Sequence, residues 1–271
     1  MTRVLAIVNQ KGGVGKTTTT VNVAAGLAKA DQRVLLVDLD PQGNATMGSG
    51  VDKRTLEHTV YQLLLGLSTA EGVRRRSETG GYDILPANRE LAGAGVEMVG
   101  LEHRETRLKT ALAHVADAYD FVLIDCPPAL NLLTVNGLVA ADAVLIPMQC
   151  EYYALEGLSD LINTNKKVRQ HLNPRLEIEG LLRTMFDPRN TLAQQVSDQL
   201  EQHFGAKVYI TIIPRNVRLA EAPSYGAPAV HFDAACKGSQ AYLALAREIL
   251  HRMDTGPEPA VAARAPAEGE R

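Results

Sequence analysis

The sequence predicts an α/β fold in which a doubly wound, mostly parallel sheet is flanked by helices. Two observations support this prediction. Short runs that are apolar throughout, such as RVLAIV (3–8) and FVLIDCPP (121–128), are typical of strands covered on both faces. These runs alternate with longer segments of helical periodicity, and strands that alternate with helices favour a parallel sheet.

Six apolar runs are predicted as strands, and a seventh is predicted as an edge strand. The six are residues 3–8, 33–40, 121–128, 143–149, 177–186 and 207–214, and the edge strand is YDILPA at 82–87. The clearest helical segments are residues 17–29, 104–118, 132–140, 155–172, 191–204 and 239–253. The segment 41–100 is glycine-rich and weakly periodic, so we expect loops and short helices there.

Length and composition indicate one domain followed by a short tail. We expect a single domain over residues 1–254 and a disordered tail over 255–271, because TGPEPAVAARAPAEGER has no apolar periodicity. Hydrophobic residues make up 45% and charged residues 22% of the chain, which is ordinary for a soluble globular protein. The net charge of −3 gives no overall attraction to nucleic acid, so any DNA-binding surface must be local.

Cysteine spacing and the lack of long apolar runs predict a cytoplasmic protein. Cys126, Cys150 and Cys236 show no C-x-x-C spacing, so we expect buried reduced thiols rather than disulfides or a zinc site. The start MTRVLAIVNQ lacks the long apolar core and cleavage site of a signal peptide, and no apolar run reaches the length of a membrane span.

The stretch NQKGGVGKTTTT (9–20) predicts a phosphate-binding loop between the first strand and the first helix. Glycines permit a tight turn and close approach of the backbone, and the exposed N–H groups and helix dipole attract anions. Lys16 is placed to reach the β- and γ-phosphates, and Thr17 is placed to ligate Mg²⁺. The alternative, a plain glycine turn, does not explain the lysine and threonines that follow.

Three aspartates follow predicted strands and are candidates for contacting the metal and the attacking water. Asp38 and Asp40 lie two residues apart, so they share one side of the pleat if strand geometry persists. Asp125 ends the apolar run FVLID, where a carboxylate can hold Mg²⁺, usually through water. A single aspartate at a strand end can instead cap the next helix. Three beside a phosphate loop favour metal-assisted phosphoryl transfer to water.

The loop departs from the usual G-x-x-x-x-G-K-[ST] pattern, because Gln10 stands where the first glycine is expected and Lys11 follows it. The resulting pattern resembles the deviant Walker A motif of the ParA/MinD family of P-loop ATPases. In that family the extra lysine reaches the partner's nucleotide across a dimer interface, so the resemblance implies an ATP-bound homodimer joined through Lys11. A lysine from each side would neutralise two facing triphosphates. The alternative is a solvated loop lysine.

Further stretches resemble the small chromosomal ParA-type subgroup, and the resemblance covers nearly all of residues 3–253. These stretches are DLDPQGNAT, QCEYYALEGL and IIPRNVRLAEAPSYG. The resemblance implies a slow, partner-stimulated ATPase that uses ATP and Mg²⁺, with Lys11, Lys16 and Asp40 as catalytic residues and Asp40 orienting the water. The Ala/Pro/Glu-rich residues after the last helix have no bulky apolar face, which argues against MinD-like membrane docking.

The resemblance also implies the residues that contact each ligand. Met185, Pro214 and Asn216 would lie near adenine, and Glu151 would reach the partner's ribose. Arg189 and Arg218 would contact DNA through its backbone, since no helix-turn-helix pattern is evident; a solvated or ion-paired arginine is the alternative. The implied nucleotide contacts are Gly12, Gly13, Val14, Gly15, Lys16, Thr17, Thr18, Met185, Pro214, Asn216 and Glu151, and the implied metal contacts are Thr17, Asp38 and Asp125.

The implied role is chromosome segregation. ATP-loaded dimers would bind double-stranded DNA non-specifically on the nucleoid, and a centromere-bound ParB-type protein would stimulate hydrolysis. One alternative is a nucleoid-associated ATPase that positions another protein cargo by the same chemistry. Another is a P-loop enzyme of small-molecule metabolism, which Lys11 and the stretch IIPRNVRLAEAPS disfavour. We expect the RRR at 74–76 to be a solvated helix end near an acidic neighbour.

Overall fold

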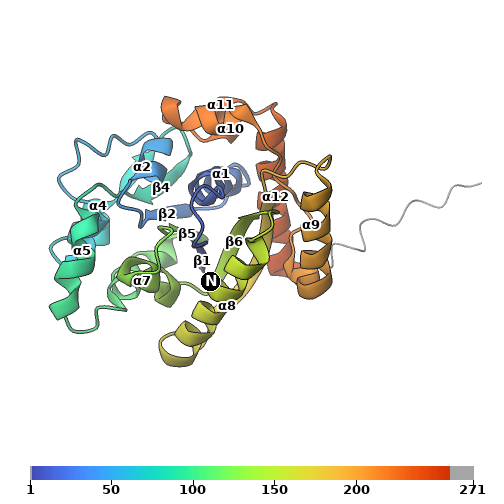
Figure 1. Cartoon of the computed structure of the whole chain (residues 1–271). Coiled ribbons are helices and arrows are strands. Elements are labelled where there is room, and N and C mark those ends of the chain that lie inside the picture. Colours follow the sequence, from blue (N-terminus) through green and yellow to red (C-terminus); the bar gives the residue numbers. More distant parts are fainter. Residues whose placement is uncertain (1, 257–271) are drawn as a thin grey trace, which may run out of the picture.

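The computed structural model describes residues 2–256, which are built around one seven-stranded sheet (Figure 1). Its strands lie in the order β3-β4-β2-β5-β1-β6-β7. Within the described residues every pairing is parallel except that between β3 and β4. The predicted doubly wound, mostly parallel sheet is confirmed. The strands are β1 (Arg3–Ile7), β2 (Val34–Asp38), β3 (Arg75–Ser77), β4 (Tyr82–Leu85), β5 (Phe121–Asp125), β6 (Ala143–Gln149) and β7 (Glu177–Thr184).

Helices cover both faces of the sheet, as Figure 1 shows. One face packs against α1 (Lys16–Lys29) and α12 (Lys237–Thr255), and the other against α7 (Leu132–Ala140), α8 (Ala154–His171) and α9 (Thr191–Phe204). The shorter helices are α2 (Asn44–Gly48), α3 (Val60–Leu65), α4 (Ala70–Val73), α5 (Leu91–Glu97), α6 (Arg107–Leu112), α10 (Val217–Glu221) and α11 (Ala229–Phe232), with 3₁₀ turns η1 (Met98–Gly100), η2 (Ala116–Ala118), η3 (Gly205–Lys207) and η4 (Ala222–Tyr225).

Alternation along the strands explains the runs that are apolar throughout. Leu5 and Ile7 of β1 belong to the core on the α1 and α12 side, whereas Ala6 and Val8 belong to the core on the opposite side. Successive side chains of a strand point to opposite faces, so a strand covered on both faces needs apolar residues at every position. Because the central strands pair in parallel, their carboxyl ends lie at the same edge of the sheet.

Most predicted helices are confirmed, but the one expected over 104–118 is shorter. The helix α6 begins only at Arg107, because residues 103–106 form a turn closed by a hydrogen bond from the Thr106 N–H to the His103 carbonyl oxygen (3.0 Å). His103 has a φ of 54°, a left-handed conformation that interrupts an α-helix. After Leu112 the chain continues into η2 instead of a further α-helical turn.

The strand predicted over residues 207–214 is wrong. This segment makes only two isolated bridges with the chain around β7 in the described structure. Side chains occupy its backbone groups instead: the Glu248 carboxylate accepts hydrogen bonds from the N–H groups of Ile210 and Thr211, both at 2.8 Å. Arg183 donates to the carbonyl oxygen of Tyr209 at 2.8 Å. The apolar run therefore lies beside β7 without forming a continuous ladder.

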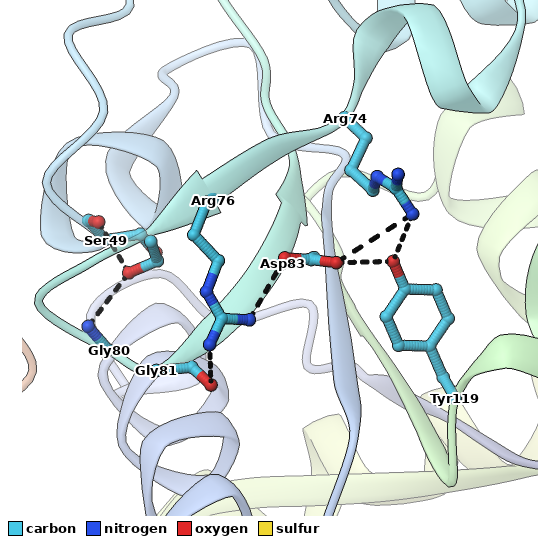
Figure 2. Close-up of polar contacts among 8 residues, drawn as sticks. Ser49, Arg74, Arg76, Gly80, Gly81, Asp83 and Tyr119 are labelled. Carbon is cyan, nitrogen blue, oxygen red and sulfur yellow. Dashed lines mark hydrogen bonds and ion pairs between the residues drawn. The ribbon is translucent and has the colours of Figure 1, made fainter.

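The strand predicted at 82–87 exists as β4, but β3 rather than β4 forms the edge of the sheet. The strand β3 contains Arg75 and Arg76, so these arginines do not form the predicted helix end. Figure 2 shows that Asp83 of β4 accepts hydrogen bonds from Arg76 (3.1 Å) and from the Tyr119 hydroxyl (2.7 Å). Asp83 is thus the acidic neighbour expected for this stretch, and its contacts reinforce a short edge strand.

The last described helix, α12, ends close to the start of the predicted tail. The helix α12 continues to Thr255, and residues 257–271 of the predicted tail lie outside the described residues. The assignment of residues 1–254 to one domain stays a prediction. Among residues 2–256, no helix combines the length and the apolar character needed to cross a membrane.

Candidate nucleotide-binding site

The predicted phosphate loop lies at the carboxyl end of β1 and leads into α1. Gly13 (φ 74°) and Gly15 (φ 86°) adopt left-handed conformations that glycine tolerates without strain. The helix α1 starts at Lys16, so the N–H groups of its first turn face the loop without helical partners. Thr184, at the end of β7, donates to the Val14 carbonyl oxygen at 2.8 Å and ties the loop to the sheet. The loop is therefore a preformed anion cradle.

Lys16 is largely buried beneath this loop. Its side chain is 7% exposed, and Nζ donates to the carbonyl oxygen of Lys11 at 3.0 Å. Burial lowers the pKa of Lys16, while the nearby carboxylates of Asp125 and Asp40 act in the opposite direction. An ammonium group held at this position offers a short, charge-assisted hydrogen bond to a phosphate oxygen.

Asp125 joins β5 to the first turns of α1. Its two carboxylate oxygens accept hydrogen bonds from the hydroxyls of Thr17 (2.7 Å) and Thr20 (3.1 Å). Asp38 is its register partner on β2, and both aspartates are buried. Burial raises the pKa of the Asp125 carboxyl, and the adjacent Asp38 raises it further.

This arrangement fits Mg²⁺. A divalent cation would relieve the repulsion between the two carboxylates and would find oxygen ligands in Thr17 and Asp125. Residues 2–256 contain no cluster of three or more His, Cys, Asp or Glu side chains of the kind that encloses a metal. Mg²⁺ does not need one, because it usually keeps several waters and takes one or two carboxylates together with substrate phosphates.

Asp38 holds the loop that follows β2. Its Oδ2 accepts hydrogen bonds from the N–H (2.8 Å) and the hydroxyl (2.7 Å) of Thr46, and its Oδ1 accepts one from the N–H of Asp40 (3.1 Å). The Thr46 hydroxyl also accepts from the N–H of Ala87, just after β4, at 2.9 Å. These hydrogen bonds show that Asp38 closes the 39–46 loop. Its contact with the metal stays a prediction.

Asp40, the predicted water-orienting residue, lies half-exposed in this loop. Its Oδ1 accepts from the Gln42 N–H at 2.9 Å, which fixes the turn around the side chain. Its charge acts to raise the pKa of Lys16, so the two side chains lie within electrostatic reach across the phosphate loop. Asp40 is partly exposed to solvent, and its role in orienting water stays a prediction.

A cavity of about 330 Å³ adjoins the loop and brings together the predicted adenine contacts. Met185, Pro214 and Asn216 line it together with Gly15 and Thr18. These residues come from three distant parts of the sequence. The cavity has the apolar walls and few polar groups that are typical of a nucleobase site.

Gln149, which sequence reasoning missed, contacts two parts of this cavity's surroundings, and the predicted residues Met185 and Asn216 have defined local conformations. Met185 has a left-handed φ of 49°, and Gln149 donates both to its Sδ (2.8 Å) and to the Gly13 carbonyl oxygen (3.3 Å). The Asn216 side chain caps α10 by accepting from the Arg218 N–H at 2.8 Å. Gln149 is the last residue of a predicted strand. A polar residue at a strand end was the one sequence feature that could have indicated its contact with the phosphate loop.

Lys11 and Gly12 form the outer lip of the loop. The Lys11 ammonium makes an ion pair with the Glu151 carboxylate, and both side chains are about half exposed (49% and 50%). A Cβ added at Gly12 would meet no atom of this chain within 4 Å. The lip therefore faces outward, unlike Lys16 beneath it.

The two predicted DNA contacts are exposed but ion-paired. Arg189, whose side chain is 88% exposed, makes a two-pronged contact with Asp187 at 2.9 and 2.8 Å. Arg218 contacts Glu221 at 2.8 Å and Asp233 at 3.3 Å. Within the chain itself, both residues are therefore ion-paired arginines, which is the alternative stated for them above. Their role in DNA binding stays a prediction.

The three cysteines are free. Cys126 and Cys150 are buried, as expected for structural thiols, while Cys236 is only partly buried and accepts a hydrogen bond from the Ser239 N–H at the start of α12. The expectation of reduced thiols is confirmed, and the expectation of burial holds for two of the three.

Known proteins resemble the chain over nearly its whole length. Residues 2–178 match the family model described as an AAA domain. The chain is 50% identical over 252 residues to the chromosome partitioning protein ParA of Caulobacter vibrioides, covering 92% of this chain and 94% of that relative. It is 52% identical over 249 residues to the sporulation initiation inhibitor protein Soj of Bacillus subtilis, with 92% and 98% covered.

A solved structure matches equally broadly. The structure of cobyrinic acid a,c-diamide synthase from Mycobacterium smegmatis, with bound ADP and magnesium, is 38% identical and superposes with a TM-score of 0.83. The match covers 96% of this chain and 98% of that one.

The hydrogen bonds around Thr46 generate a prediction. Thr46→Val keeps the side-chain shape but leaves the buried Asp38 carboxylate and the Ala87 N–H each short of a partner. We expect the free energy of unfolding to fall by about 1–3 kcal/mol, measured by denaturant titration with circular dichroism. Thr46→Ser, which retains the hydroxyl, should lose clearly less. Equal unfolding midpoints for the valine variant and the original protein would contradict the assignment.

Proposed function

We propose a function from the premise that this chain belongs to the AAA-domain family matched by residues 2–178 and, within it, to the ParA/MinD group of P-loop ATPases. The chain is an ATPase that uses ATP and Mg²⁺, and its relatives support a partition role. In our proposal the ATP-loaded form is a homodimer that binds double-stranded DNA non-specifically. A ParB-type centromere-binding protein stimulates hydrolysis, and DNA is then released.

The observation that carries this proposal is the outward-facing lip. A loop that only had to hold its own nucleotide would need Lys16 and the backbone N–H groups beneath it. Here a second cation, Lys11, lies outside that cradle beside Gly12, where an added Cβ would meet no atom of its own chain within 4 Å. Such a lip fits a surface against which a second copy packs, with each Lys11 placed near the triphosphate held by the other.

Release of Lys11 from Glu151 is a small obstacle to this exchange. Both partners of the ion pair are about half exposed (49% and 50%), and such pairs contribute about 0–1 kcal/mol. A triphosphate carries several negative charges in place of one, so it attracts the ammonium more strongly than Glu151 does. Glu151 is then free to contact the partner's ribose.

Hydrolysis follows from the same geometry. Backbone N–H groups of the loop and the Lys16 ammonium would hold the β- and γ-phosphates, while Thr17 and Asp125 would hold Mg²⁺, which when bound would offset negative charge on the phosphates. Asp40 would accept a hydrogen bond from a water molecule and orient its oxygen toward the γ-phosphorus. As the new bond to this oxygen forms, the bond between the γ-phosphorus and the β-phosphate oxygen breaks, ADP leaves, and the water's proton passes to the phosphate product or to solvent. Asp38, through its hydrogen bonds with Thr46 and the Asp40 N–H, holds the loop that carries the Asp40 carboxylate.

Two other functions are distinguished by measurement. A nucleoid-associated ATPase that positions a different cargo would show the same chemistry and differ only in its partner. A metabolic enzyme gains support from the similarity to the diamide synthase structure. The higher identity to proteins named ParA and Soj favours the partition role. Turnover at metabolic rates without DNA or a protein partner would reverse that preference.

Asp40→Ala tests hydrolysis and dimerisation together. Loss of the water-orienting carboxylate should slow ATP hydrolysis by about a hundredfold and leave ATP binding intact. The variant should accumulate as a DNA-bound dimer with ATP, measured by light scattering coupled to gel filtration and by DNA retention. A monomeric Asp40→Ala protein saturated with ATP would contradict the proposed switch.

Gly12→Val tests the lip. A Cβ added at Gly12 meets no atom of its own chain within 4 Å, so we expect the variant to fold and bind ATP but to remain monomeric, because the valine obstructs the second copy. Gly100→Val is the matched control, since an added Cβ there likewise meets nothing; it should dimerise normally. A Gly12→Val protein that still dimerises with ATP would place the interface elsewhere.

The salt dependence of DNA binding tests the arginines. Two arginines in each protomer give about four phosphate contacts in the dimer. We expect a slope of log K against log salt of about −3 to −4, which corresponds to a roughly hundredfold loss of affinity between about 50 and 200 mM salt. Arg189→Glu with Arg218→Glu should abolish binding and keep dimerisation, measured by fluorescence anisotropy.

The control for this pair is Arg33→Glu with Arg54→Glu. Both arginines are exposed and ion-paired with neighbouring aspartates, as Arg189 is. The control changes the net charge equally, so it should reduce DNA affinity only slightly. Equal losses in both double variants would mean that net charge, and not this surface, controls binding.

A further inference from the structure

A second strongly basic region lies at the far end of α8, away from the phosphate loop. The carboxyl-terminal half of α8, the start of β7 and η3 enclose a cavity of about 380 Å³. Lys166, Arg169 and Lys207 line it, together with Glu177 and apolar side chains such as Phe204. The carboxyl end of β7 contacts the phosphate loop through Thr184, so this cavity, at the amino end of the same strand, belongs to a different region of the molecule.

The cations of this region are not neutralised within the described chain. Lys166, Arg169 and Lys207 have no ion-pair partner among residues 2–256, and neither do the adjacent Lys167 and Arg175. We call these five residues the α8 basic surface. One carboxylate that lines the cavity, Glu177, opposes them.

The two arginines predicted to contact DNA, unlike the α8 basic surface, are ion-paired within their own chain. Arg189 and Arg218 are each held by carboxylates of their own chain. For a protein of net charge −3, attraction to a polyanion depends on a surface where positive charge is left uncompensated.

Asn165 supplies an independent observation. It lines the same cavity, its side chain is 6% exposed, and neither Nδ2 nor Oδ1 has a hydrogen-bond partner in the described structure. A buried amide without a partner destabilises a fold, and such groups call for an explanation. A rotation of this side chain that brings Nδ2 to the cavity wall would let a phosphate oxygen accept from the amide and from the surrounding cations at once.

Helix-end electrostatics does not account for the whole surface. Positive side chains near the carboxyl end of α8 offset the negative end of the helix dipole, which explains Arg169. Arg175 and Lys207 lie outside this helix, on the loop before β7 and in η3. Lys207 lines the cavity together with Lys166 and Arg169, and Arg175 directly precedes the lining residue Leu176, so the surface is not a property of one helix.

We propose that the α8 basic surface is a second contact for the DNA backbone; the inference rests on the proposed function, that the protein binds DNA. A nucleic-acid backbone alternates charged phosphates with less polar sugars, which suits cations set around a partly apolar cavity. Contacts of this kind carry no sequence information and strengthen binding through counterion release. The surface therefore adds affinity for DNA of any sequence.

The test is the double variant Lys166→Glu with Arg169→Glu. Its matched control is Arg89→Glu with Lys109→Glu, which changes two exposed cations elsewhere and gives the same net charge. Affinity for a random-sequence DNA duplex is measured by anisotropy with a non-hydrolysable ATP analogue over a range of salt. We expect about tenfold or greater loss of affinity for the first variant and a salt slope smaller by about 2 for each protomer in contact.

The possible outcomes separate the inference from the proposed function. DNA affinity equal to that of the control overturns the inference, while DNA loss in the Arg189 and Arg218 variant still supports the function. DNA binding that is intact while stimulation by the protein partner is lost assigns the surface to an acidic protein and also overturns the inference. An original protein that does not retain DNA at all overturns the function itself.

A second variant separates loss of DNA binding from loss of folding. Asn165→Leu removes the unpartnered amide, so its thermal stability should equal or exceed that of the original protein. We expect its DNA affinity to fall several-fold, because one donor to phosphate is lost. Unchanged DNA affinity in a protein of equal or greater stability would show that Asn165 is only a packing residue and would contradict its place in the proposal.

Discussion

Two buried carboxylates at the ends of neighbouring strands organise the site. Asp125 and Asp38 lie opposite each other in the β5–β2 pairing, yet they bind different elements. Asp125 holds the threonines of α1, which fixes the phosphate loop, and Asp38 holds Thr46 and the backbone of Asp40, which fixes the hydrolytic loop. Because like charges in a buried site repel, a divalent cation that arrives with ATP stabilises both at once.

Most of the proposed site lies within one chain, and only the contact made by Lys11 would require a second copy. The phosphate loop, the Thr17–Asp125 pair proposed to hold the metal and the cavity proposed for adenine all lie within one chain. Lys11 lies outside that set, tied to Glu151 by a contact that nucleotide charge can outweigh. Nucleotide binding can therefore precede dimerisation, and the product ADP, which lacks the γ-phosphate, gives a partner's lysine less charge to hold. In the proposed dimer, such an order of events would make ATP hydrolysis the step that separates the copies.

The sequence predicted the parts of the site that lie close to strand ends. The order of strands and helices follows from periodicity, and the phosphate loop follows from its glycines, Lys16 and Thr17. The strand at 207–214 was wrong because Glu248, distant in sequence, occupies its N–H groups. Thr46 was missed for a related reason. Its bond to Asp38 depends on how the 39–46 loop folds back, and composition carries no signal for that path.

Charge distribution links the site to the DNA-binding proposal. A chain of net charge −3 is repelled by DNA at long range, so a single protomer with a small basic surface gains little. Joining two protomers doubles the number of phosphate contacts on one rigid body, and the affinity then grows as the product of the separate contributions rather than their sum. A dimer can therefore remain on DNA under salt conditions in which a monomer dissociates. The proposed switch needs no rearrangement within the protomer, because in it the nucleotide would act by holding two copies together.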